Sequence, residues 1–381
     1  MEATVEETEI RPVKISEFAL CSGKALKNVE VVYETHGTLN KAKDNVVLVF
    51  HALSGSAHIA GLNKSFAKKC RFWTEENHVG WWNDFVGKGK IIDTEKNFVI
   101  CQNILGGCYG TTGPSSTNPE TGKPYGSSFP DIEIEDIVRL QKLVLEKLGI
   151  KKLKCIIGSS LGGFIALEYA VLFGKDIEKA AFIASATQTS AINQLEGLEQ
   201  IFAIENDPHF SGGDYYGSLF PLHGLMLARM IAAKRYVNMD TIAQRAKNEI
   251  MLPSDYFYNY RLRHHTESYM FHQGQKFVKR FDANTYLLIL KAIQNFNVAN
   301  KYGAGSLESI FSQENASHPF YLVGSITSDV CCYPSEQKLL VNALRKANVN
   351  YMYEFIYSGK GHDSFLLEPD RYDFLGDFLE R

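Results

Sequence analysis

Ser160 lies in the pentapeptide Gly158-Ser159-Ser160-Leu161-Gly162, between an apolar run at 153–157 and a helical pattern at 163–170. A serine flanked by glycines between a strand and a helix is typical of a nucleophile elbow, the sharp turn that presents a reactive hydroxyl. The turn needs small residues because neighbouring segments pass too close for side chains. We therefore expect Ser160 to be the nucleophile of an acyl transfer, with the Leu161 amide as a donor to the oxyanion.

An acid and a histidine follow this serine in the order that catalysis requires. Asp329 is the first acid after the apolar run 319–324, and His362 comes soon after the run 351–356. In hydrolases with such an elbow the order along the chain is serine, acid, histidine. Taken alone, Asp329 would be interpreted as a turn residue and His362 as an exposed loop residue. Together with Ser160 they predict a triad, in which His362 accepts the serine proton and Asp329 orients the imidazole.

A second oxyanion donor is expected from the loop that follows an early strand. The apolar run 45–50 leads into His51-Ala52-Leu53-Ser54-Gly55, so we assign this role to the backbone amide of Leu53. His51 and His58 flank the loop and need no catalytic role.

The remaining histidines and cysteines predict neither a metal site nor a redox site. His264, His265 and His272 lack the spacing and the cysteine partners of a zinc site. The seven cysteines are scattered, which favours free thiols in a reducing cytoplasm. Cys331 and Cys332 are neighbours, but adjacent cysteines rarely form a relaxed disulfide, so we assign both to packing.

The elements that must position these residues follow from the hydrophobic pattern. Apolar runs alternate with helical patterns, which predicts an α/β fold: the α/β-hydrolase fold, with a mostly parallel sheet and helices on both faces. The three site loops then open on one edge of the sheet. The expected strands are 31–35, 45–50, 97–101, 153–157, 179–184, 319–324 and 351–356, and the expected helices include 134–148, 335–346 and a last one from about 370.

The alternation stops between 187 and 304, where helices are expected at 224–234 and 239–251. We therefore predict a catalytic core formed by 1–186 and 305–381, with 187–304 inserted as a helical lid.

The composition excludes several classes of protein. The chain has 381 residues, 22% of them charged, and a net charge of −3, which does not favour nucleic-acid binding. Its apolar runs are too short to span a membrane. The acidic first residues lack the apolar core of a signal peptide, so we expect a cytoplasmic protein with no membrane partner.

Long strings beyond the triad resemble the homoserine O-acetyltransferase family of the α/β-hydrolase superfamily, over nearly the whole chain. They differ from generic hydrolase turns, which makes the resemblance specific. They are Tyr33-Glu34-Thr35-His36-Gly37-Thr38-Leu39-Asn40, His51-Ala52-Leu53-Ser54-Gly55, Gly80-Trp81-Trp82-Asn83-Asp84, Asn103-Ile104-Leu105-Gly106-Gly107-Cys108, Gly110-Thr111-Thr112-Gly113-Pro114-Ser115-Ser116, Asn118-Pro119-Glu120-Thr121-Gly122-Lys123-Pro124-Tyr125-Gly126, Ser328-Asp329 and Gly361-His362-Asp363-Ser364-Phe365-Leu366.

The resemblance implies transfer of an acetyl group from acetyl-CoA to the hydroxyl of L-homoserine, by a double displacement through an acyl-serine. This reaction is an early step of methionine biosynthesis. The family also implies a cytoplasmic homodimer with a helical lid, in which acetyl-CoA is a co-substrate and no further cofactor is needed.

By the same resemblance, Arg229, Asp363 and Tyr236 bind the amino acid. An arginine fork suits a carboxylate, and an acid beside His362 suits an ammonium group. Tyr236 lies seven residues after Arg229 and shares its face on a helix. Without the resemblance, Arg229 would be interpreted as a surface ion-pair residue and Tyr236 as core. Leu161 departs from the family, where methionine often follows the nucleophile, but this exchange conserves volume.

Three alternatives remain open at this point. Succinyl-CoA donors and serine acceptors occur among relatives, and a serine esterase would use the same triad with water as acceptor. A hydrolase fold without catalysis, used for binding, is disfavoured by the intact triad.

Overall fold

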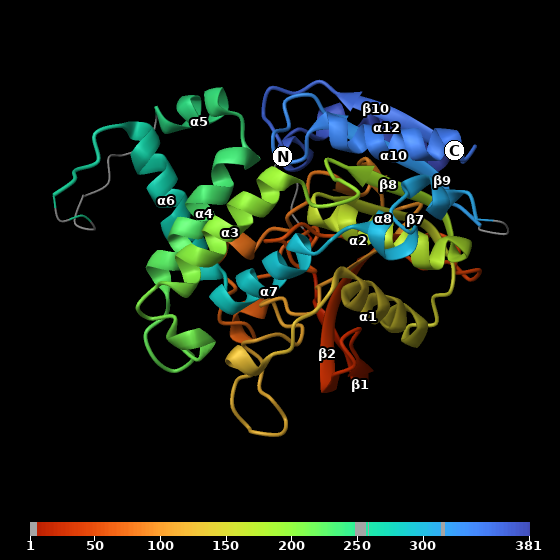
Figure 1. Ribbon diagram of the computed structural model, residues 1–381. Helices are drawn as coiled ribbons and strands as arrows, with labels where there is room; N and C mark the ends of the chain where they lie inside the picture. Colours follow the sequence, from red (N-terminus) through yellow and green to blue (C-terminus); the bar gives the residue numbers. More distant parts are fainter. Residues whose placement is uncertain (1–5, 248–256, 258, 314–316) are drawn as a thin grey trace.

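The computed structural model describes residues 6–247, 257, 259–313 and 317–381 of the chain. An eight-stranded sheet runs through the molecule in the order β1-β2-β6-β3-β7-β8-β9-β10 (Figure 1). Neighbouring strands from β6 to β10 in this order are parallel, whereas β1 and β2 are antiparallel to their neighbours. The expected mostly parallel sheet is thereby confirmed. The strands are β1 Arg11–Ala19, β2 Ala25–His36, β3 Val46–Phe50, β6 Phe98–Gln102, β7 Leu153–Ser159, β8 Ile177–Ile183, β9 Phe320–Ile326 and β10 Tyr351–Ile356, with β4 Val86–Gly87 and β5 Ile92–Asp93 in a separate small pair.

Some helices pack around this sheet, and others, α3 to α7, form a group beside it (Figure 1). Those of the first set are α1 Ile134–Lys147, α2 Leu161–Phe173, α10 Pro334–Lys346, α11 Ser364–Leu367 and α12 Asp373–Glu380. Those between β8 and β9 are α3 Ala191–Glu205, α4 Leu222–Tyr236, α5 Met239–Ala246, α6 His265–Arg280, α7 Ala283–Gln294, α8 Val298–Tyr302 and α9 Leu307–Phe311.

The strand β3 shows why the sheet is buried on both faces. All five of its residues are buried, and side chains alternate between the faces of a strand. Val46, Leu48 and Phe50 belong to the larger core cluster, together with residues of α1 and α2. Val47 and Val49 belong to a second cluster, which includes α12. An uninterrupted apolar run is therefore required, as expected for a central parallel strand.

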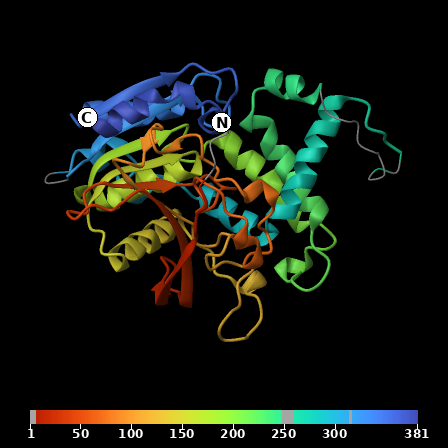
Figure 2. The ribbon, with the colours of Figure 1, turned by 180° about the vertical axis from the view of Figure 1, so that it is seen from behind.

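Helices α3 to α7 gather on one side of the sheet in Figure 1, and the view from behind shows the same separation (Figure 2). Among the described residues between β8 and β9, no strand joins the main sheet. The helix expected at 239–251 begins as α5, and residues 248–251 lie outside the described part of the chain. The division into a core and a lid at 187 and 304 stays a prediction.

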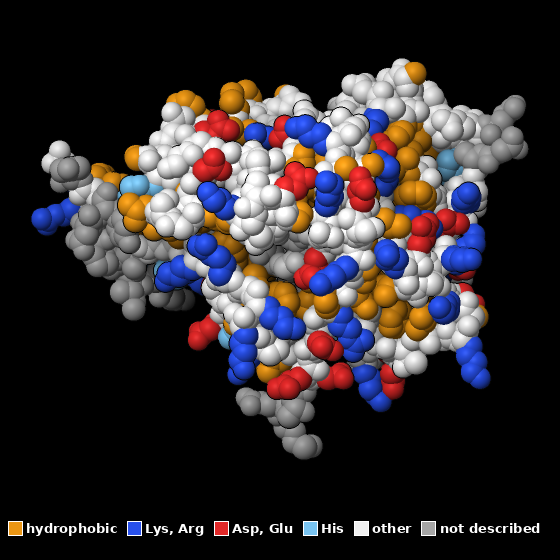
Figure 3. Space-filling model, turned by 90° about the horizontal axis from the view of Figure 1, so that it is seen from below, with side chains coloured by type: hydrophobic (Ala, Val, Ile, Leu, Met, Phe, Trp, Pro, Cys, Tyr) orange, Lys and Arg blue, Asp and Glu red, His pale blue; other side chains and the backbone are white. Residues whose placement is uncertain are grey.

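The described surface is mixed in charge where it is seen from below. Figure 3 shows lysine and arginine side chains interspersed with aspartate and glutamate on that face. In the described ranges, no helix has both the length and the apolar composition needed to cross a bilayer.

Candidate active site

Ser160 occupies a strained turn between β7 and α2. Its φ of 57° and ψ of −127° lie in a region that non-glycine residues rarely adopt. A Cβ atom on Gly158 would lie 2.0 Å from the carbonyl oxygen of Gly162, and one on Gly162 would lie 2.2 Å from that of Phe50. Both positions therefore require glycine. The Ser160 amide donates a hydrogen bond of 3.1 Å to the Ile183 carbonyl on β8, which fixes the turn to the sheet.

His362 and Asp329 form a buried pair on loops that follow β10 and β9. The Nδ1 atom of His362 lies 2.8 Å from Oδ2 of Asp329, and each residue is 2% exposed. Burial alone would lower the pKa of His362, but the negative charge of Asp329 and its hydrogen bond outweigh burial and raise the pKa above its ordinary value. Nε2, the other ring nitrogen, is buried and has no hydrogen-bond partner among the described residues.

The Asp329 carboxylate is held by its own loop. Its Oδ1 atom accepts hydrogen bonds from the backbone amides of Cys331, at 2.7 Å, and Cys332, at 2.9 Å. Because Oδ2 binds the imidazole, both oxygens are used, and the orientation of the carboxylate is fixed. When the imidazole is neutral, this arrangement sets Nδ1 of His362 as the protonated nitrogen and leaves the lone pair of Nε2 free.

The loop that carries Leu53 is pinned by His51. The ring of His51 donates from Nδ1 to the Ala52 carbonyl at 2.8 Å and accepts from the Ile104 amide at Nε2. Burial lowers the pKa of His51 to about 4, so the ring is neutral and structural at neutral pH. The amides of Leu53 and Leu161 have no acceptor in the described part of the chain, which leaves both free for an oxyanion.

Residues predicted to bind an amino acid meet at the end of α4. The guanidinium of Arg229 lies 5.1 Å from the ring centroid of Tyr236 and 4.8 Å from that of Phe277. The Asp363 amide donates a hydrogen bond of 2.8 Å to the Tyr236 carbonyl, and the Tyr236 ring centroid lies 6.2 Å from that of His362. The helix end and the histidine loop are thus joined directly.

Arg229 and Asp363 form no ion pair within the described residues, although Arg229 stacks on two aromatic rings. Neither side chain has an ion pair or a hydrogen bond there, although both are partly buried. Burial raises the pKa of the Asp363 carboxyl, and the nearby charges of His362 and Arg229 oppose that rise. Two opposite charges that share a site and remain unpaired can bind the two ends of a zwitterion.

Gly361 allows the histidine loop to approach α4 so closely. Its φ of 79° lies in the left-handed region, and a Cβ atom there would lie 2.7 Å from the Asn238 amide nitrogen. The sequence interpretation used this glycine only as part of a resembling string. Its role in packing the loop against the helix depends on a long-range contact that no local pattern contains.

Two further buried charged groups, one of which contacts the Asp329 loop, were missed by sequence reasoning. The Glu34 carboxylate binds Nδ1 of His58 at 2.9 Å and Nε2 of His36 at 3.0 Å; burial would raise its pKa, but these bonds outweigh it and lower the pKa to about 2. Arg235 binds Glu196 at 3.0 Å and the Val330 carbonyl, so it ties α3 and α4 to the loop of Asp329. The string around Glu34 was a signal for the first group; nothing in the sequence distinguished Arg235 from other arginines.

Comparisons with known proteins show the family to which the chain belongs. A model of the α/β hydrolase fold family matches residues 45–369. A homoserine O-acetyltransferase of Methanococcus vannielii is 43% identical over 369 residues, covering 96% of this chain and 71% of the relative. One from Carboxydothermus hydrogenoformans is 38% identical, covering 100% of this chain and 97% of the relative.

Solved structures give the same result. The homoserine O-acetyltransferase of Bacillus anthracis superposes with a TM-score of 0.86 at 26% identity, covering 99% of this chain and 98% of that one. Esterase E22 also reaches a TM-score of 0.86, at 28% identity, covering 98% of this chain and 100% of that one. The chain therefore belongs to the homoserine O-acetyltransferase family, which is built on the α/β-hydrolase fold.

Proposed function

We propose that the protein transfers an acetyl group from acetyl-CoA to the hydroxyl of L-homoserine, an early step of methionine biosynthesis, through an acyl-enzyme on Ser160. The observation that carries the proposal is the oriented His362–Asp329 pair with a free, buried Nε2. The family named in the comparisons supports the choice of substrates. Acetyl-CoA is the only co-substrate that this route needs, and no resident cofactor takes part.

The first half-reaction acylates the serine. Nε2 of His362 takes the proton of Ser160 as the hydroxyl oxygen attacks the thioester carbonyl. The amides of Leu53 and Leu161 stabilise the oxyanion, and the carbon–sulfur bond breaks as the histidine returns its proton to the CoA sulfur. In the second half-reaction the homoserine hydroxyl attacks the acyl-serine, again with His362 taking and returning the proton.

Arg229 and Asp363 are proposed to hold the acceptor for this second step. The guanidinium would bind the homoserine carboxylate, and the Asp363 carboxylate, next to His362 in sequence, would bind the ammonium group. The Tyr236 ring contacts the Arg229 guanidinium and lies near the His362 ring, and we propose that it also contacts the amino acid. A simple esterase has no need for this pair of charges, although the likeness to esterase E22 makes hydrolysis the second candidate. Succinyl-CoA is the alternative donor, and serine is the alternative acceptor.

The nucleophile is tested by the Ser160→Ala variant. We expect a loss of roughly 10³-fold or more in acetyl transfer, since removal of a triad member has such effects. Mass spectrometry of the wild-type protein with acetyl-CoA alone should show an added acetyl group that the variant lacks. Near-normal activity in the variant would end the assignment. CoA release that homoserine does not accelerate would favour hydrolysis.

The acceptor site is tested by Arg229→Ala. We expect the KM for homoserine to rise roughly 10- to 100-fold, because a hydrogen bond to a charged group contributes about 1.5–3 kcal/mol. The KM for acetyl-CoA should change little. Arg139→Ala is the matched control, since Arg139 is also partly buried and stacks on a phenylalanine, but on α1. Equal effects of the two variants would refute the carboxylate role. Rates with acetyl-CoA against succinyl-CoA as donor, and with homoserine against serine as acceptor, would distinguish the substrates.

The protonation of His362 has a direct test by nuclear magnetic resonance. The imidazole should titrate above the ordinary histidine pKa of about 6.5, and in Asp329→Asn it should titrate lower, because the opposing charge is gone. His318 is an internal control, since burial lowers its pKa. As His362 accepts a proton only when neutral, acylation should speed up as pH rises through this pKa. A wild-type value below 6.5 would contradict the account.

We further propose that the enzyme is a homodimer joined through α3. On this helix Leu195 is 61% exposed, Leu198 61% and Phe202 65%. Their spacing places them on one face of the helix, and contact of such an apolar face with water is unfavourable. The family's usual state supports a second copy as the occupant. All seven cysteines are free, which supports a cytoplasmic location.

The dimer is tested by light scattering on the eluted protein. The wild-type chain should have twice the monomer mass, and Leu198→Glu together with Phe202→Glu should yield monomers. Leu339→Glu, which changes an exposed leucine on α10, should leave the mass unchanged. A monomeric wild-type protein would reject the proposal.

A further inference from the structure

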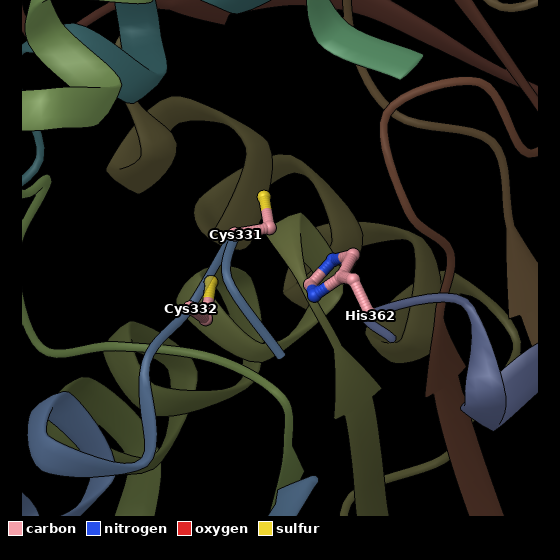
Figure 4. Close-up of side chains that lie close together, drawn as sticks. All are labelled: Cys331, Cys332 and His362. Atoms are coloured by element: carbon pink, nitrogen blue, oxygen red, sulfur yellow. The ribbon is translucent and has the colours of Figure 1, made fainter. Parts of the chain in front are cut away.

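Two thiols lie beside the catalytic histidine. The sulfur atoms of Cys331 and Cys332 and a ring nitrogen of His362 all lie within 4.8 Å of one another. Figure 4 shows the nitrogen-bearing edge of the imidazole turned toward the loop that carries both cysteines. The sequence interpretation assigned the cysteines to packing, because nothing in their local pattern indicates that His362, thirty residues later, lies next to them.

The position of the cysteine loop is fixed on two sides. The Asp329 carboxylate accepts both cysteine amides, as described above. The Cys331 carbonyl accepts a hydrogen bond of 3.0 Å from Asn193 of α3, and Arg235 of α4 binds the Val330 carbonyl. The two sulfurs are therefore held near the imidazole by contacts that do not involve the thiols themselves.

The imidazole is oriented as metal ligands usually are. Asp329 occupies Nδ1, so the free donor is Nε2, a buried atom without a partner among the described residues. A carboxylate on one ring nitrogen and a metal on the other is the common arrangement for metal-bound histidine, because the carboxylate fixes the tautomer and the ring plane. Two thiols and one imidazole are soft and borderline donors that suit Zn²⁺.

We propose that Cys331, Cys332 and His362 bind a Zn²⁺ ion that reversibly inhibits the enzyme. Two thiol protons leave to solvent, the two sulfurs and Nε2 become ligands, and a water molecule completes a tetrahedral site; no electron is transferred. Tetrahedral geometry at a Zn–S distance of about 2.3 Å places two sulfurs roughly 3.8 Å apart. Because the donor atoms already lie within 4.8 Å of one another, the two sulfurs need to approach by at most about 1 Å.

Inhibition follows from the identity of the nitrogen. Nε2 is the atom that must accept the proton of Ser160, so zinc and catalysis compete for one lone pair. This step rests on the proposed acetyl transfer. Removal of the ion by a chelator should restore the base without any other change.

A second group, Cys21 with Glu133 and Glu135, also gathers donors within 4.8 Å. It carries no proposal, because Cys21 and Glu133 are exposed and Glu135 is only partly buried. It supplies a control instead.

The binding test uses metal-free full-length protein titrated with Zn²⁺ against a chromophoric chelator, and with Cd²⁺ while the ultraviolet absorbance of thiolate–cadmium bonds is recorded. We expect one ion per chain at the site. Cys331→Ser should weaken zinc binding about tenfold or more and reduce the cadmium band. Cys331→Ala gives the same information if the serine variant folds poorly. Cys21→Ser should titrate like the wild-type protein. Equal zinc affinity in the Cys331 and Cys21 variants would overturn the site.

The activity test separates this inference from the proposed function. In the wild-type protein, Zn²⁺ should abolish acetyl transfer and a chelator should restore it, whereas Cys331→Ser should need about tenfold more zinc relative to its own metal-free rate. Transfer that zinc leaves unaffected would reject inhibition while supporting the proposed function. Zinc binding by a protein with no acetyl transfer would support the site and reject the function.

Discussion

The close approach of backbone segments around Ser160 is the constraint on which the site depends. A side chain at Gly158 or Gly162 would run into backbone atoms of α2 or β3. The strained φ of Ser160 can persist only because β7, β8 and α2 are all packed around it. The burial of the central sheet thus stabilises the turn that exposes the Ser160 hydroxyl. Loss of packing far from the site would allow the turn to relax to an unstrained backbone conformation.

The parallel strands place the other site residues near Ser160. Since β7, β9 and β10 all point the same way, the loops that follow them open on one edge, and Ser160, Asp329 and His362 all come from that edge. Helix α4 adds a second fixed point. Gly361 packs on the end of α4, and Arg235 ties the same helix to the Asp329 loop. The position of the His362–Asp329 pair therefore depends on both the sheet and α4.

The sequence predicted those parts of the molecule that have a local signature. The central strands are continuous apolar runs, and the elbow has a motif, so their type and order were clear. The strand β1 was missed because its buried residues, Ile15 and Phe18, are three apart and its other positions are mostly exposed, which breaks the alternation. The placement of Arg235 and of the two adjacent cysteines was also missed. Each depends on contacts across long separations in sequence, which a local pattern does not contain.

The pairing of charged side chains differs between the site and the rest of the interior. Elsewhere, buried charges are satisfied: Asp282 accepts hydrogen bonds from Tyr215 and Tyr216, and the fully buried Glu34 binds two histidines. At the site, Arg229 and Asp363 lie partly buried and form no ion pair within the described residues, although Arg229 stacks on Tyr236 and Phe277. A small molecule that carries both an anion and a cation would complement the two side chains, which is the physical basis of the acceptor site proposed above.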